Sequence, residues 1–186
     1  MDWATEAVDA GLEFGGPSTV GRSIHDYLRS RLVNSEAGIV FYDHGPGEMA
    51  DFVAITADED KVRVALYHCK ASPGTPAGGR VEDAYEVCGQ AAKCVRWANP
   101  RMVLEAIMRR LGRVSGGSRF DKGSVAAVQE TLGSTNRKPV MFESIIVQPG
   151  LSKSRLGDRV GPLLAAADGF LYEFGRFTKL RIIGSS

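Results

Sequence analysis

The chain has 186 residues, of which 44% are hydrophobic and 24% are charged, and this composition is typical of a globular protein with a single domain and a sizeable core. The net charge of +1 neither requires nor excludes a nucleic-acid partner, because a local basic patch can occur within a balanced total. No apolar run reaches the roughly 18 residues of a membrane span, and no signal peptide is evident, so we expect a cytoplasmic protein with no membrane contact. Cys69, Cys88 and Cys94 form no CxxC pair. We therefore expect no disulfide scaffold and no structural zinc.

The N-terminal part of the chain is expected to form two helices and then three strands. Ser18 or Thr19 would cap the second helix, and a Gly-Gly-Pro break separates it from the first. An acidic turn between the second and third strands indicates an antiparallel hairpin. The expected helices are 3–13 and about 18–33, and the expected strands are 38–42, 49–57 and 61–70.

The rest of the chain alternates helical and extended patterns. Pro100 occupies the first turn of a helix, where proline is tolerated, and Pro149-Gly150 is expected to stop a strand. The resulting order of elements predicts a mixed α/β fold (α+β) with one central mixed sheet. The expected helices are 80–97, 100–111, 124–132 and 157–172, the expected strands are 139–150 and 179–184, and 72–79 and 112–124 are expected loops.

Polar residues end two neighbouring apolar strands. Asp51 lies in the second, and His68-Cys69-Lys70 ends the third. Because side chains alternate along a strand, His68 and Lys70 continue the apolar face that begins at Val62. A lysine on a core-facing row must be paired or desolvated. If the strands are neighbours, Asp51 lies beside His68 and Lys70 and could hold a divalent metal with them.

This order of elements and these residues resemble the PD-(D/E)xK, or restriction-endonuclease-like, nuclease superfamily. The likeness rests on Asp51, on HCK at 68–70 and on the helix VEDAYEVCGQAAKCVRW, and more narrowly it is to a nuclease domain that accompanies helicase-type bacterial defence proteins. It covers most of residues 37–184. The resemblance implies an αβββαβ core, within about 18–184, with extra helices.

The resemblance also implies a site for Mg²⁺ or Mn²⁺. Asp51 and the backbone carbonyl of Cys69 would be metal ligands, and Lys70 would orient water or stabilise charge. His68 departs from the pattern, since it stands where the superfamily usually has Asp or Glu, and an imidazole suits Mn²⁺ better than Mg²⁺. The helical Gln90 matches a residue that supports the site in some members. Candidates for the missing carboxylate are Glu48, Asp83 and Glu86.

The expected substrate is DNA, and RNA is not excluded. Lys153 and Arg155 are candidates for contacts with the phosphate backbone. A helicase partner, or a helicase domain in the same protein, and a homodimer are further expectations from the resemblance. His25 and Asp26 lie on the helix that borders the active site in nucleases of this class.

Two alternatives remain open. The His68 departure also fits a degenerate nuclease fold that binds nucleic acid or assists assembly without cleaving. A Cys69 nucleophile with His44 or His68 as base is disfavoured, because Cys69 and His68 point to opposite faces of a strand and catalytic pairs need hydrogen-bond reach. Each charged residue named above could also be an ordinary surface or core residue.

Overall fold

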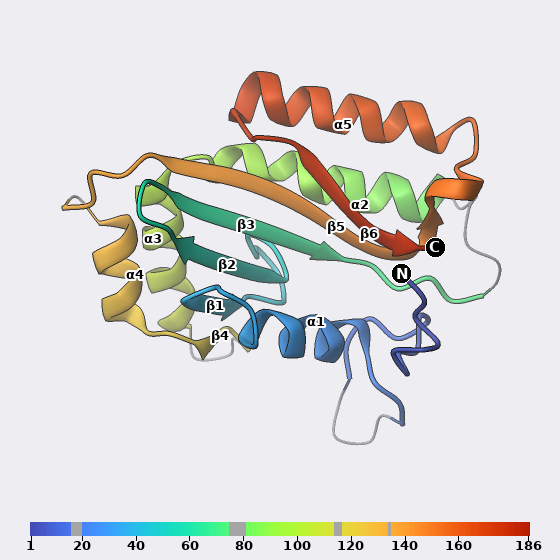
Figure 1. The fold of residues 1–186 in the computed structure, drawn as a ribbon, viewed down its shortest axis with the longest axis horizontal. Helices are drawn as coiled ribbons and strands as arrows, with labels where there is room; N and C mark the ends of the chain where they lie inside the picture. Colours follow the sequence, from blue (N-terminus) through green and yellow to red (C-terminus); the bar gives the residue numbers. More distant parts are fainter. Residues whose placement is uncertain (16–19, 75–80, 114–116, 134) are drawn as a thin grey trace.

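The computed structural model describes residues 1–15, 20–74, 81–113, 117–133 and 135–186. A six-stranded mixed sheet lies between helices on both faces, with α2 and α5 on one face and α1 on the other (Figure 1). The mixed α/β fold with one central sheet is therefore confirmed. The helices are α1 (Ile24–Val33), α2 (Val81–Lys93), α3 (Pro100–Leu111), α4 (Val125–Leu132) and α5 (Val160–Gly175), with 3₁₀ turns η1 (Cys94–Trp97) and η2 (Lys153–Arg155). The strands are β1 (Ile39–Tyr42), β2 (Phe52–Ala57), β3 (Val62–Cys69), β4 (Arg119–Lys122), β5 (Val140–Ser152) and β6 (Leu180–Ser185).

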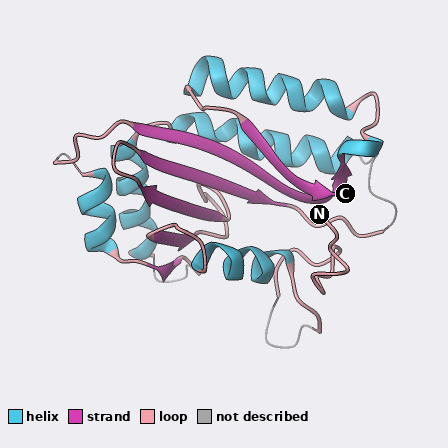
Figure 2. Ribbon diagram, in the orientation of Figure 1, coloured by secondary structure: helices cyan, strands magenta, loops and turns pink. Residues whose placement is uncertain are grey.

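The strand order in the sheet is β4-β1-β2-β3-β5-β6. β1, β2 and β3 form an antiparallel meander, and β4 pairs antiparallel with β1. Between β3 and β5 the chain passes through α2, η1, α3, β4 and α4, and β5 then pairs parallel with β3, as β6 does with β5 (Figure 2). The expected hairpin of the second and third strands is confirmed.

Alternation along β2 and β3 divides the core into two clusters. Val53 and Leu66 face α2, α3 and α5, whereas Phe52 and Cys69 face α1. Cys69 is thus a buried core residue, as its alternation with His68 predicts. Among the described residues, no helix is long and apolar enough to cross a membrane.

Several expected elements differ from the structure. Residues 3–13 form turns rather than a helix. The first helix starts at Ile24, with Ser23 in a capping box with Asp26, while Ser18 and Thr19 lie outside the described residues. The expected loop 112–124 contains the short edge strand β4, whose polar residues obscure the strand pattern. β5 also continues through Pro149 to Ser152 instead of stopping there. Residues 75–79 of the expected loop 72–79 are outside the described part.

Candidate functional site

The loop between β1 and β2 is held by a buried ion pair. Asp43 at its start accepts hydrogen bonds from the Arg110 guanidinium on α3, from the Ser118 hydroxyl (2.9 Å) and from the Met49 N–H (2.9 Å). Arg110 also donates to the carbonyl of Pro46 at 2.8 Å. Because a buried charge must be paired, this interaction fixes the course of the loop. His44, Glu48 and Asp51 all lie on or directly after this loop.

Asp51 lies just before β2 rather than within it, and only 2% of its surface is exposed. Its Oδ2 atom accepts a hydrogen bond of 2.8 Å from the backbone N–H of Cys69 on β3. Its Oδ1 atom lies 3.0 Å from His44 Nδ1 and 3.4 Å from His25 Nε2. Burial raises the pKa of Asp51, but the hydrogen bond from His44, the nearby His25 imidazole and the Cys69 N–H together outweigh burial and lower it. Asp51 is therefore ionised at neutral pH.

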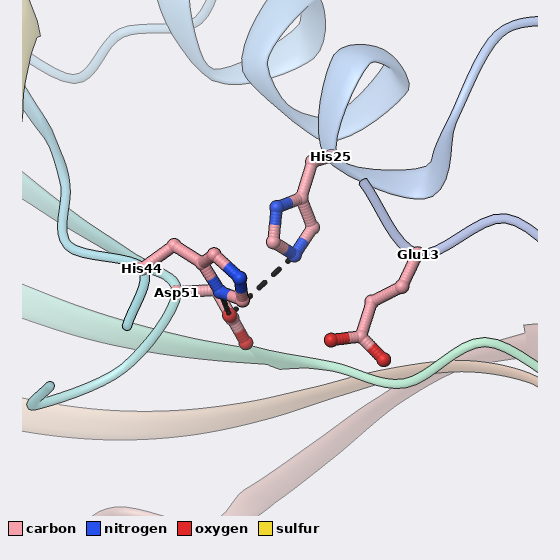
Figure 3. A group of neighbouring side chains, drawn as sticks. All are labelled: Glu13, His25, His44 and Asp51. Atoms are coloured by element: carbon pink, nitrogen blue, oxygen red, sulfur yellow. Dashed lines mark hydrogen bonds and ion pairs between the residues drawn. The ribbon is translucent and has the colours of Figure 1, made fainter. Parts of the chain in front are cut away.

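Four side chains converge at this point. Glu13 comes from the segment before α1, His25 from the first turn of α1, His44 from the β1–β2 loop and Asp51 from the start of β2 (Figure 3). Figure 3 shows His25 directed from α1 toward Asp51, with His44 and Glu13 on either side. One nitrogen or carboxylate oxygen from each residue lies within 4.8 Å of the others. We call these four residues the carboxylate–imidazole cluster, and its donors could hold a metal ion.

His25 is buried and neutral. Only 1% of its surface is exposed, and burial lowers its pKa to about 4. Its Nδ1 atom lies 3.3 Å from the hydroxyl of Tyr42, whose pKa burial raises to about 12. Its Nε2 atom is buried and forms no hydrogen bond with any described residue. A buried polar atom with no hydrogen bond is rare in proteins and calls for a physical explanation.

The other two residues of the cluster, Glu13 and His44, and the neighbouring Glu48 are only partly buried, and the pKa of each is raised. The hydrogen bond to Asp51 raises the pKa of His44, which favours its protonated form. Burial raises the pKa of Glu13, and the charge of Asp51 acts in the same direction. Glu48 lies 3.7 Å from His44 Nδ1, and burial and the charge of Asp51 raise its pKa to about 7. A carboxyl group with this pKa can take up or release a proton near neutral pH.

The cluster borders an open cleft of about 640 Å³. Glu13 and His44 line it, together with Lys70, which forms an ion pair of 2.8 Å with Glu86 on α2. Lys70 Nζ also lies 3.8 Å from Glu13 Oε2, so that its ammonium group is next to the cluster. The other charged or polar residues of the wall are Glu48, His68, Gln90, Lys93 and Arg96.

His68 takes part in a different interaction from the one expected. Its Nε2 atom lies 2.7 Å from Cys94 Sγ on η1, and both side chains are buried. Burial lowers the pKa of His68 to about 4 and raises that of the Cys94 thiol, so both groups are neutral. In the described part of the chain, His68 does not belong to the carboxylate–imidazole cluster. The histidines whose ring nitrogens lie within 3.4 Å of Asp51 Oδ1 are His25 and His44, and the role of His68 as a metal ligand stays a prediction.

The other predicted residues are divided between the cleft and other surfaces. Lys70, Gln90, Glu48 and Glu86 line the cleft, and the Gln90 side-chain oxygen is buried without a hydrogen bond to the described residues. Glu48 and Glu86 do not belong to the cluster as the described residues define it. The Cys69 peptide contributes its N–H to Asp51, and its carbonyl as a ligand stays a prediction. The Asp83 side chain is outside the described part, and Lys153 and Arg155 on η2 are exposed and do not line this cleft.

Sequence reasoning missed Glu13 and the roles of His25 and His44. Glu13 lies 38 positions before Asp51 in a segment expected to be a helix, so no local pattern indicated it. Its backbone carbonyl accepts from the N–H of His25 at 3.0 Å, and its carboxylate accepts from Ala71 at 3.3 Å. These contacts between the segment, α1 and the end of β3 place it at the site.

The arrangement can bind a divalent cation, hold a lysine beside it and accept a proton at Glu48. Two carboxylates and two imidazoles are common donors for divalent ions. Comparisons with protein-family models, curated proteins and solved structures found no significant match to this chain.

Proposed function

We propose that the protein is a metal-dependent nuclease that hydrolyses phosphodiester bonds of DNA at the cleft beside Asp51. The observation that carries this proposal is the meeting of the carboxylate–imidazole cluster with Lys70 at one open cleft. Hydrolysis of a phosphodiester needs a cation to offset charge, a positively charged group near the phosphate and a route for protons. The cleft offers a residue set for each of these needs.

The order and pairing of the elements support a restriction-endonuclease-like core. α1 is followed by the antiparallel meander β1, β2 and β3, then by α2, and after α3, β4 and α4 by β5, which lies parallel to β3. We interpret α1, β1, β2, β3, α2 and β5 as the αβββαβ core that the resemblance implies, with α3, α4, α5, β4 and β6 as additions. In this proposal Asp51 and Lys70 stand at the ends of the second and third core strands.

The residues of the chain divide the chemistry as follows. A divalent ion such as Mg²⁺ or Mn²⁺, held by the cluster, would lower the pKa of water and neutralise charge on the phosphate. Lys70 places its ammonium group where it offsets negative charge that develops on the phosphate oxygens. Glu48, with a pKa of about 7, accepts or donates a proton at the cleft. Gln90 offers its unpaired side-chain oxygen from α2 to a polar group that enters the cleft.

Three basic side chains of the cleft offer contacts to a phosphate backbone. Lys93 and Arg96 line the cleft with Lys70, beside the carboxylates of Glu13, Glu48 and Glu86. Contacts of this kind position a nucleic acid without reading its sequence. DNA, a helicase partner and a role in defence against foreign DNA follow from the family resemblance and complete the proposal.

A plasmid-cleavage assay with Mg²⁺ or Mn²⁺ tests this function. Asp51→Asn and Lys70→Met are expected to lower the rate of nicking at least about 100-fold, since each removes a group that acts on the reacting phosphate. Matched controls are Asp158→Asn and Lys179→Met, which alter exposed residues away from the cleft. Equal nicking by Asp51→Asn, Lys70→Met and the wild type would contradict the proposal.

The position of His68 favours a second candidate function. Since the superfamily position for Asp or Glu is occupied by a histidine bonded to Cys94, the fold could serve as a nucleic-acid-binding module without cleavage. DNA binding and DNA cleavage, measured separately, distinguish the two functions. Retained DNA binding by Asp51→Asn together with no cleavage by the wild type, in any metal, would support the binding module.

A further inference from the structure

The two imidazoles of the cluster bear on which metal the protein binds. We infer that the cluster is a centre for a first-row transition-metal ion, with His25 Nε2, His44 Nδ1, Asp51 Oδ1 and a Glu13 carboxylate oxygen as ligands, and is not an all-oxygen Mg²⁺ site. This inference deepens the proposed function and rests on it for its catalytic meaning. Metal binding itself is measured without nucleic acid.

The distances within the cluster fit one ion. Adjacent ligands of an octahedral ion with bonds of roughly 2.1 Å are separated by about 3.0 Å, and opposite ligands by about 4.2 Å. Asp51 Oδ1 lies 3.0 Å from His44 Nδ1 and 3.4 Å from His25 Nε2, close to the separation of adjacent ligands. All four donor atoms lie within 4.8 Å of one another, so side-chain shifts of a few tenths of an ångström bring them to one ion.

His25 provides an independent reason to expect an ion. Its Nε2 atom is buried, is directed at Asp51 and forms no hydrogen bond with the described residues (Figure 3). Burial of such an atom is unfavourable unless a partner binds to it. A metal ion supplies that partner, since neutral imidazole nitrogen is among the commonest metal donors in proteins.

The surroundings of the donors are those of a prepared metal site. Metal-binding histidines usually donate the second ring N–H to an oxygen, which fixes the tautomer, and Tyr42 Oη lies 3.3 Å from His25 Nδ1. The Cys69 N–H holds the second oxygen of Asp51 and orients its carboxylate. Both interactions leave His25 Nε2 and Asp51 Oδ1 directed toward the centre.

The donor set determines the class of ion. Mg²⁺ requires nearly octahedral oxygen ligands and keeps several waters, whereas imidazole binds Mn²⁺, Co²⁺ and Zn²⁺ well. Two of the four ligands are nitrogens, and their donor atoms lie 3.0 and 3.4 Å from Asp51 Oδ1. We therefore expect Mn²⁺ to bind at least about tenfold more tightly than Mg²⁺.

Isothermal titration of the metal-free protein with Mn²⁺ and with Mg²⁺ measures this preference, and pulsed EPR of the Mn²⁺ complex detects coordinated ¹⁴N. His25→Gln and His44→Gln are each expected to weaken Mn²⁺ binding at least about tenfold, and Tyr42→Phe by roughly tenfold through the orientation of His25. The matched control is His68→Gln, which removes the third histidine and is expected to leave Mn²⁺ affinity within about twofold, since it lies outside the cluster.

Wild-type EPR keeps the test decisive even if a buried variant fails to fold. Nitrogen modulation together with the Mn²⁺ preference supports the inference. Absence of ¹⁴N coupling, or equal affinity for Mg²⁺ and Mn²⁺, overturns it. A protein that binds Mn²⁺ through nitrogen but cleaves no DNA would retain the metal centre while the proposed function fails.

Discussion

Replacement of His68 by glutamine tests whether His68 is a buried neutral residue of the core. The test is the pH dependence of the free energy of unfolding. Burial lowers the pKa of His68 from 6.5 to about 4. A group with a lowered pKa in the folded state contributes stability that is present above the unfolded pKa and is lost as the pH falls. At 1.36 kcal/mol per unit, the full loss between pH 6.5 and pH 4 is about 3 kcal/mol.

Urea unfolding at pH 7.5 and at pH 5, in the presence of a chelator, measures the effect. At pH 5 about 2 kcal/mol of the His68 contribution is already lost in the wild type, and His68→Gln is expected to lack this loss. The variant is less stable than the wild type at pH 7.5, because it loses the interaction with Cys94. The difference in the free energy of unfolding between the wild type and His68→Gln therefore narrows as the pH falls.

Comparison of the two proteins removes the contributions of other groups. His25 has the same sign as His68, since burial lowers its pKa to about 4. Glu48 has the opposite sign, because its raised pKa of about 7 makes the folded protein more stable as the pH falls toward 4.5. Both groups are present in the wild type and in the variant. Parallel stability curves for the two proteins would refute the assignment of His68 as a buried neutral residue.

Two further predictions concern the framework of the site and of the fold. Arg110→Met leaves the Asp43 carboxylate buried without its partner, and we expect it to lower the free energy of unfolding by about 3–5 kcal/mol. The double variant Arg110→Met/Asp43→Asn should recover part of this loss. If urea unfolding finds no loss for Arg110→Met, the ion pair does not hold the loop. Gly133→Ala would place a Cβ atom against the carbonyl oxygen of Gln129 and is expected to lower the free energy of unfolding by about 1–3 kcal/mol. Gly169→Ala in α5 meets no atom within 4 Å and is expected to raise the stability by about 0.5–1 kcal/mol, so thermal unfolding should separate the two glycines by sign.

Local patterns were sufficient where an element has its own periodicity and boundary signals. The helix from Pro100 to Leu111 and the hairpin of β2 and β3 follow from such patterns, and both are in the structure. β4 was missed because it has only four residues at the edge of the sheet, and none of them is fully buried. A short edge strand leaves little hydrophobic alternation for a sequence to display.

The site was predictable only in part, because its members come from four separate segments. Asp51 and Lys70 were predicted from their positions at the ends of apolar runs. In the structure, Lys70 lines the cleft and Asp51 belongs to the carboxylate–imidazole cluster. Glu13 is brought to the site by backbone contacts with α1 and β3, which a one-dimensional pattern does not contain. His68 was considered as a ligand from its position before Lys70 and from the family resemblance, and neither could reveal that its Nε2 atom lies against Cys94 Sγ.

The hydrogen bond between the Cys69 N–H and Asp51 couples the proposed metal centre to the alignment of two strands. A shift of β2 by one residue relative to β3 would present the wrong amide to the carboxylate and turn every side chain of the shifted strand to the other face. Chains that pair these strands incorrectly would therefore lack the centre altogether. The stoichiometry of tightly bound metal in a preparation then measures the fraction of molecules whose sheet has assembled in the native register.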